Sequence, residues 1–69
     1  MRTEIYEADP FTNNKTAHFL TLETDYRFEP RDEFFLTTEK GQRLKVRVTH
    51  VRVEVAAGGL RRELIVMKL

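Results

Sequence analysis

The most constraining feature of this sequence is a change of phase inside one long alternating stretch, RLKVRVTHVRVEV, residues 43–55. Apolar residues occupy even positions up to Val48 and odd positions from Val51 onward. Side chains alternate between the two faces of a strand, so one extra residue moves every later side chain to the other face. A strand that keeps one apolar face across this switch needs a bulge or a sharp bend at Thr49-His50. The alternative is a turn between two strands, which is less favoured because no Gly, Pro, Asn or Asp lies there.

Alternation with a period of two also dominates the first half of the chain, which predicts strands there. We expect strands in RTEIYE (2–7) and HFLTLETDYRF (18–28), joined by the loop ADPFTNN (8–14), which is rich in turn residues. In the second of these strands the apolar residues at even positions share one face: Leu20, Leu22, Tyr26 and Phe28. Phe19 is expected on the opposite face.

Two hairpins are predicted in the second half of the chain, one turning at Gly41 and one at Gly58-Gly59. In the first hairpin Phe34 and Leu36 match the inward face, and Phe35 points outward. The predicted fold is therefore all-β: a small antiparallel barrel or strongly bent sheet of five or six strands, with little or no helix. Small barrels bend their strands in this way to remove exposed sheet edges.

The length of 69 residues predicts one small domain spanning 1–69. The chain contains no Cys, so neither a disulfide nor a thiolate zinc site supports its core. Its start lacks the apolar run of a secretory signal, and its longest apolar run, LIVM (64–67), is too short to span a bilayer. We therefore expect a cytoplasmic protein that does not enter the membrane.

The sequence offers little material for catalysis. It has neither Ser nor Cys, and none of its eight Thr residues lies in a recognisable nucleophile motif. His18 and His50 are 32 residues apart, and neither has a partner at metal-ligand spacing. The sequence thus predicts no enzyme activity, no cofactor and no metal site.

The outward face of the alternating stretch carries a basic row, defined as Arg43, Lys45, Arg47 and Arg52. Single-stranded nucleic acid binds where basic side chains contact phosphates and aromatic rings stack on bases. Phe35 and Phe19 are the candidate rings. The other interpretation is a solvated outer face, since Lys and Arg on open strands also keep sheets soluble.

Charge is distributed unevenly along the chain. Residues 1–39 carry four bases and nine acids, whereas residues 40–69 carry eight bases and two acids. Such asymmetry marks either an interaction surface or two halves that neutralise each other within one sheet. We favour the second interpretation for so small a domain.

Four successive residues near the end of the sequence are apolar, namely Leu64, Ile65, Val66 and Met67. A strand that is apolar on both faces is covered on both faces. The outer face of this strand is therefore a candidate interface with a second copy or another protein. Alternatively, a loop or the first strand folds over it.

The pattern FEPRDEFFLTTEKGQRLKVRVTHV, within residues 28–55, resembles the middle of small barrels of the Src-homology-3-like and ASCH/PUA-like types. Many ASCH/PUA-like barrels are associated with RNA. The resemblance implies a corner, a strand, a hairpin and a second strand. Arg31 replaces the glycine usual at that corner, the glycine–lysine motif of ASCH domains is absent, and no ligand site is carried over.

Together these features predict a non-catalytic protein-binding or assembly module. It is expected to form a homo-oligomer or to bind a protein partner. The alternative is a nucleic-acid-binding small barrel that uses the basic row and Phe35.

Overall fold

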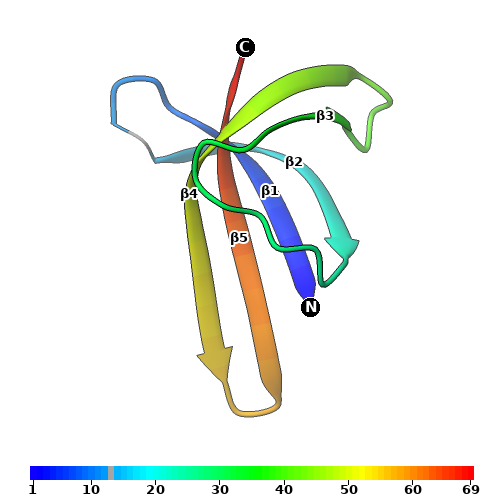
Figure 1. The fold of residues 1–69 in the computed structure, drawn as a ribbon, viewed down its shortest axis with the longest axis vertical. Coiled ribbons are helices and arrows are strands. Elements are labelled where there is room, and N and C mark those ends of the chain that lie inside the picture. The colour runs from blue at the N-terminus through cyan, green and yellow to red at the C-terminus, as the bar shows by residue number, and fades with distance from the viewer. Residues whose placement is uncertain (13) are drawn as a thin grey trace.

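A computed structural model describes residues 1–12 and 14–69; Asn13, at the predicted loop 8–14, lies outside the described residues. The described residues form five strands: β1 (Arg2–Ala8), β2 (Lys15–Glu23), β3 (Glu33–Thr37), β4 (Arg43–Ala56) and β5 (Gly59–Lys68). They make one sheet in the order β2-β1-β5-β4-β3. The sheet curls strongly into a half-barrel (Figure 1), which confirms the all-β prediction.

The phase switch in the sequence is a β-bulge within one continuous strand. Val48 of β4 pairs with Val66 of β5, and His50 pairs with the preceding residue, Ile65. Thr49 is the additional residue, and its Oγ1 donates a hydrogen bond of 2.9 Å to the carbonyl of Ile65. The bulge therefore keeps the apolar side chains before and after it on one side of the sheet.

The centre of the sheet is the parallel pair β1–β5, in which Ile5 lies beside Leu64. The other three strand pairs are antiparallel. Alternation in the sequence predicts which face a residue occupies, but it does not specify which strands pair. The parallel pair is accordingly the part of the topology that the sequence pattern did not anticipate.

The core lies on the concave side of the half-barrel. It is formed by side chains from four strands: Ile5, Leu36, Val46, Val48, Leu64 and Val66. Phe34 pairs with Val46 and packs against this core, while Phe35 pairs with Lys45 and is 59% exposed. The predicted register of the first hairpin is confirmed.

Two predictions for residues 18–28 were wrong. Phe19 does not face outward: a register shift in the β1–β2 pair makes it an extra residue, and it packs against the core beside Leu20. The strand also ends at Glu23 and does not continue to Phe28. Residues 24–32 instead cross the concave side of the sheet (Figure 1), and we call them the crossing segment.

The second hairpin projects from the body of the sheet. Pairing between β1 and β5 starts at Arg2 and Arg61, so the end of the β4–β5 hairpin extends past β1 (Figure 1). We call residues 53–60 the hairpin arm. Val55 pairs with Leu60, and these two side chains share the concave side with Val53 and Leu64 because faces alternate along each strand.

A tight turn ends the crossing segment and leads into β3. The backbone N–H of Asp32 donates to the carbonyl of Glu29 at 3.1 Å, Pro30 occupies the second turn position, and Arg31 has a φ of 77°. These are features of a type II turn, whose third position favours glycine because φ is positive. Arg31 thus occupies the position at which the resembling barrels have glycine.

Replacing Arg31 with glycine should stabilise the protein. Left-handed backbone costs a residue with a Cβ about 1–2 kcal/mol, and glycine's additional unfolded-state entropy offsets about 0.5–1 kcal/mol of that gain. We expect Arg31→Gly to raise the free energy of unfolding by about 0.5–1 kcal/mol in urea denaturation. Arg31→Ala is the control, because it removes the side chain but keeps the strain. Equal stability of the two variants would contradict a strained turn.

Candidate functional site

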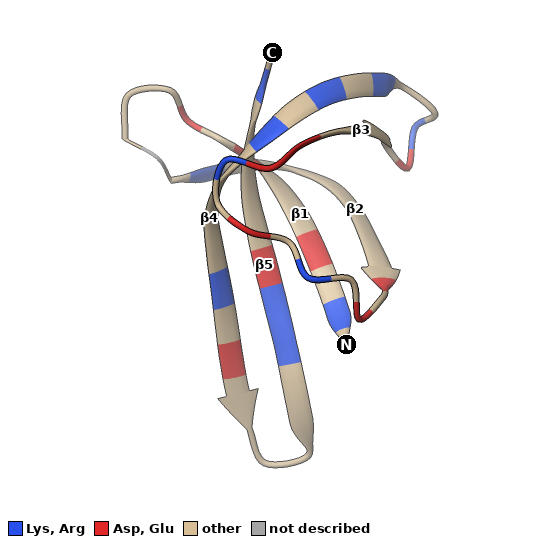
Figure 2. Ribbon diagram, in the orientation of Figure 1, with Lys and Arg blue, Asp and Glu red and all other residues tan. Residues whose placement is uncertain are grey.

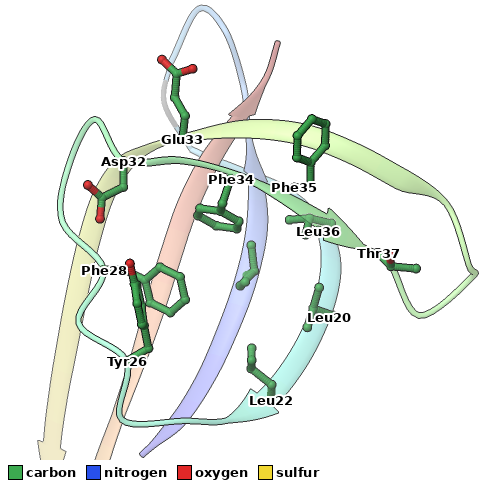
Figure 3. A pocket seen from close by; sticks show the side chains of 11 residues that line it. Leu20, Leu22, Tyr26, Phe28, Asp32, Glu33, Phe34, Phe35, Leu36 and Thr37 are labelled. Carbon is green, nitrogen blue, oxygen red and sulfur yellow. The ribbon is translucent and has the colours of Figure 1, made fainter.

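The half-barrel is closed at one end and open at the other. At the closed end the N–H of Glu39, in the turn between β3 and β4, donates to the carbonyl of Phe19 in β2 at 3.0 Å. Away from this bond, the edge strands β2 and β3 enclose a groove with a volume of about 510 Å³ (Figure 3). A volume of roughly 300–1,000 Å³ is typical of binding sites. The groove is therefore the candidate functional site.

The walls of the groove are apolar and partly aromatic. Tyr26 and Phe28 of the crossing segment contact each other edge to face, with their ring centroids 4.7 Å apart. The ring centroid of Phe28 lies 5.3 Å from that of Phe34 in β3. The opposite wall is formed by Leu20 and Leu22 of β2 (Figure 3). Alternation along β2 and β3 directs Leu20, Leu22 and Phe34 into the groove, and the path of the crossing segment adds Tyr26 and Phe28. Such a surface binds apolar side chains.

A buried arginine fixes the crossing segment to the sheet. Arg62 of β5 is 7% exposed, and its Nε donates to Thr3 Oγ1 at 2.8 Å. Its Nη2 donates to the carbonyl of Thr24 at 3.2 Å and to that of Tyr26. The guanidinium also lies 5.2 Å from the ring centroid of Phe28. One side chain therefore positions the aromatic wall of the groove.

Sequence reasoning missed Arg62, although a signal for it was present. Arg62 has the same parity as Leu64 and Val66, and alternation places all three on the concave side. A charge at an inward position is buried only when hydrogen bonds satisfy it. Here two carbonyls of the crossing segment and the Thr3 hydroxyl supply those bonds.

Removing the Arg62 side chain should destabilise the protein and release the crossing segment. Arg62→Ala leaves buried acceptors unpaired, so we expect a loss of about 2–4 kcal/mol in the free energy of unfolding. Arg61→Ala is the matched control, because this neighbour lies on the exposed face and pairs there with Glu54 at 3.0 Å. Tyr26 amide exchange should accelerate only in the Arg62 variant. Similar effects of both substitutions would contradict the positioning role.

Two acidic residues of the groove lining, Asp32 and Glu33, lie where β3 begins. The side chain of Glu33 points away from the groove (Figure 3). The side-chain hydrogen bond from Arg47, at 2.8 Å, and the positive charge of this residue hold the pKa of Glu33 below its ordinary value of 4.5. A general acid at neutral pH requires the opposite shift. Glu33 therefore does not have the pKa of a general acid, and its ion pair with Arg47 joins β3 to β4.

The basic row lies along β4 (Figure 2). Because faces alternate along the strand, its side chains lie on the convex side, opposite the core residues Val46 and Val48. Arg47 is bound to Glu33, and Lys45 Nζ lies 3.9 Å from the same carboxylate. Arg43 and Lys45 lie over the ring of Phe35, at 4.5 Å and 5.9 Å from its centroid. Arg52 is separated from these residues by the bulge. Part of the row's charge is consequently neutralised within the protein.

The four apolar residues near the end of the sequence lie in β5, at the centre of the sheet. Leu64 and Val66 belong to the concave core, and Ile65 is fully buried on the convex side, where its register partners are Tyr6 and His50. The first strand lies beside β5 and not over it. Of these four residues only Met67, at 41% exposure, is accessible to a partner.

The two histidines are not brought together with other ligands. His18 Nε2 is 2.8 Å from Thr21 Oγ1, and His50 Nδ1 is 3.3 Å from Thr49 Oγ1. Among residues 1–12 and 14–69, no three His, Cys, Asp or Glu side chains are grouped in a way that would hold a metal ion. The same residues include no helix with the length and apolar character needed to cross a membrane.

Comparison with known proteins leaves the groove as the basis for inferring function. No protein-family model, curated protein sequence or solved structure matches this chain. The geometry and charge of the small all-β half-barrel are therefore the guide to its function.

Proposed function

We propose that the protein is a non-catalytic assembly module that self-associates by covering its apolar groove. The observation that carries this proposal is the groove itself, since apolar and aromatic side chains line a volume of about 510 Å³ that is open to solvent. Apolar surface gains about 25 cal/mol for each Å² removed from water, so a partner that covers the groove is favoured. Asp32 supplies a polar group at the edge of this apolar surface, as in many protein interfaces.

The position of the groove supports a protein partner. Its two walls include β2 and β3, which are the edge strands of the sheet. Edge strands present backbone N–H and C=O groups that pair readily with another chain. We also propose that residues 28–55 resemble the middle of a Src-homology-3-like barrel. The type II turn corresponds to the corner of that pattern, and the first hairpin and the bent β4 correspond to its hairpin and second strand.

The proposal predicts a mass above that of the monomer, which light scattering measures over a range of protein concentrations. Leu22→Glu places a charge in the groove wall, and it should return the mass to that of a monomer because an unpaired charge is costly to bury. Thr21→Glu is the matched control, since this residue is adjacent in β2 but exposed on the other face. Circular dichroism would establish that both variants are folded.

Two results would contradict the proposal. One is a monomeric mass for the unmodified protein at the highest concentration that remains soluble. The other is an oligomer that Leu22→Glu and Thr21→Glu weaken equally, which would place the interface outside the groove.

A second candidate is binding of single-stranded nucleic acid on the basic row. It is favoured by one observation, the exposed ring of Phe35 with the cationic groups of Arg43 and Lys45 over it. Because Arg47 is bound to Glu33, we expect the other three residues of the basic row to contact phosphates. The logarithm of the binding constant should then fall with the logarithm of the salt concentration at a slope of about −2, or roughly −0.7 for each contact.

Fluorescence anisotropy with a labelled single-stranded DNA and an RNA of the same sequence tests this candidate. Lys45→Gln should weaken binding to both and flatten the salt slope by about 0.7. Arg47→Gln is compared with Lys45→Gln, because the Arg47 variant also breaks the ion pair that neutralises Glu33. Failure to bind either oligonucleotide at low salt would leave the basic row as a solvated face.

A further inference from the structure

The half of β4 that runs into the hairpin arm has an open edge. β3 pairs with β4 over residues 43–47, and the turn before β3 bonds to Val48. Beyond Val48, within the described part of the chain, β4 pairs only with β5, and it forms the outer border of the sheet there (Figure 1). We call residues 51–55, which read VRVEV, the open edge. An uncovered strand edge pairs readily with another strand.

The backbone of the open edge directs hydrogen-bonding groups outward at alternate residues. Ala56 pairs with Gly59 across the two-residue turn of the hairpin, so the N–H and C=O groups of Ala56 face β5. These groups alternate in direction along an antiparallel strand, and those of Arg52 and Glu54 therefore also face β5. The groups that face the open side belong to Val51, Val53 and Val55.

The side chains of the open edge are apolar on one face and charged on the other. The concave face carries the three valines, of which Val53 and Val55 are 56% and 75% exposed. Arg52 and Glu54 lie on the convex face, because faces alternate along the strand. A strand that pairs with this edge would cover apolar surface on one face and meet two opposite charges on the other.

The two charges of the open edge differ in their partners within the chain. Glu54 is bound by Arg61 at 3.0 Å. The register partner of Arg52 is Glu63, whose carboxylate is bound by Lys15 at 2.9 Å. In the part of the chain that the structure describes, Arg52 forms no ion pair. It is therefore available to a carboxylate on another chain.

From these observations we infer that two copies of the chain pair antiparallel along their open edges, with Val53 on the twofold axis. The segment VRVEV is complementary to itself in this register. Val51 lies opposite Val55 of the second copy, and Val53 lies opposite its own counterpart, so the outward backbone groups exchange hydrogen bonds. On the convex face Arg52 lies opposite Glu54 of the second copy, and this ion pair forms twice. The contact is closed, as in most homodimers.

Charge selects this register among those that the backbone allows. Because the outward groups recur at every second residue, the pairing can shift only in steps of two residues. One step in one direction places Arg52 opposite Arg52 of the second copy, and one step in the other places Glu54 opposite Glu54. Like charges directly opposite each other destabilise a strand pair. The register centred on Val53 sets each Arg52 against a Glu54 and avoids both repulsions.

Edge pairing is a contact separate from the groove, since none of residues 51–55 lines the groove. It goes beyond the proposed function and does not depend on it. Five residues a side make a small contact, compared with roughly 20–30 a side in a stable interface, so edge pairing requires a higher protein concentration than a contact that covers the groove. In the Leu22→Glu variant, whose groove contact is removed, edge pairing can be measured alone.

The first test measures the dimer dissociation constant of Leu22→Glu chains by sedimentation equilibrium, up to high protein concentration. Adding Arg52→Glu or Glu54→Arg should raise this constant about tenfold or more, because each change sets like charges opposite each other twice. An equimolar mixture of these two variants should associate about as tightly as the Leu22→Glu parent, since each glutamate then meets an arginine. An effect confined to one chain would not be reversed by mixing.

Arg61→Glu is the matched control for the mixing experiment. It changes the net charge of the chain by the same amount as Arg52→Glu, but it lies in β5, away from the open edge. Its mixture with Glu54→Arg should stay weaker than the parent, because one of the two pairs still sets Arg52 against the substituted arginine. Edge pairing would be overturned if the mixture of Arg52→Glu with Glu54→Arg associated no better than either variant alone.

The second test uses disulfide formation in chains that keep Leu22, because the sequence contains no cysteine. Residues 52 and 54 face each other as a pair without backbone hydrogen bonds, whose Cα atoms lie about 4.5 Å apart and within reach of a disulfide. A mixture of Arg52→Cys with Glu54→Cys should give mainly the mixed disulfide under mild oxidation, and it keeps one of the two ion pairs. Two chains of the same variant hold their cysteines about 7–8 Å apart, which is too far. Mass spectrometry separates the products, and the proportions given by random collisions would contradict the register.

The outcomes for the open edge and for the groove are distinct. If the Leu22→Glu chain is monomeric at every concentration and the cysteine mixture shows no preference for the mixed disulfide, edge pairing is overturned and the groove contact is unaffected. If the unmodified and Leu22→Glu chains associate equally and Arg52→Glu weakens both, the groove contact fails and edge pairing is supported.

Discussion

The bulge at Thr49 lets a single strand serve two parts of the sheet that point in different directions. Before the bulge β4 pairs with β3, and from Val46 to Ala56 it pairs with β5. Without the extra residue, either Val46 and Val48 or Val51 and Val53 would face the convex side. The continuous apolar face of β4, on which the core is built, therefore depends on this one inserted residue.

The groove depends on a charge in the interior. Arg62 replaces water as the hydrogen-bond donor to two carbonyls of the crossing segment, so irregular backbone can lie against the sheet. The guanidinium also lies against Phe28. An aliphatic residue at this position would pack on the sheet but would leave those carbonyls unsatisfied. Hydrogen bonds from Arg62, and not apolar packing alone, therefore hold the aromatic wall of the groove in place.

Much of the fold could be predicted from alternation, because alternation reports directly on which face is buried. The bulge and the opposite orientations of Phe34 and Phe35 were predicted in this way, and the two hairpin turns were predicted from their glycines. The groove could not be predicted, since it is a gap between β2 and β3 that depends on how far the sheet curls. The misplacement of Phe19 has a similar cause: a bulge in β2 carries no change of phase in the sequence, because Phe19 and Leu20 are both apolar.

The parallel pairing of β1 with β5 has a consequence for how the chain acquires its structure during synthesis. Thr3 and Arg62, which face each other in this pair, are 59 residues apart in the chain. The ribosome must therefore complete nearly all of the sequence before the middle of the sheet can form. Closing so long a loop is entropically costly, and folds dominated by distant contacts fold slowly, over milliseconds to seconds. Until then the apolar faces of β1 and β2 stay uncovered, and exposed apolar surface makes such partly folded chains prone to aggregate.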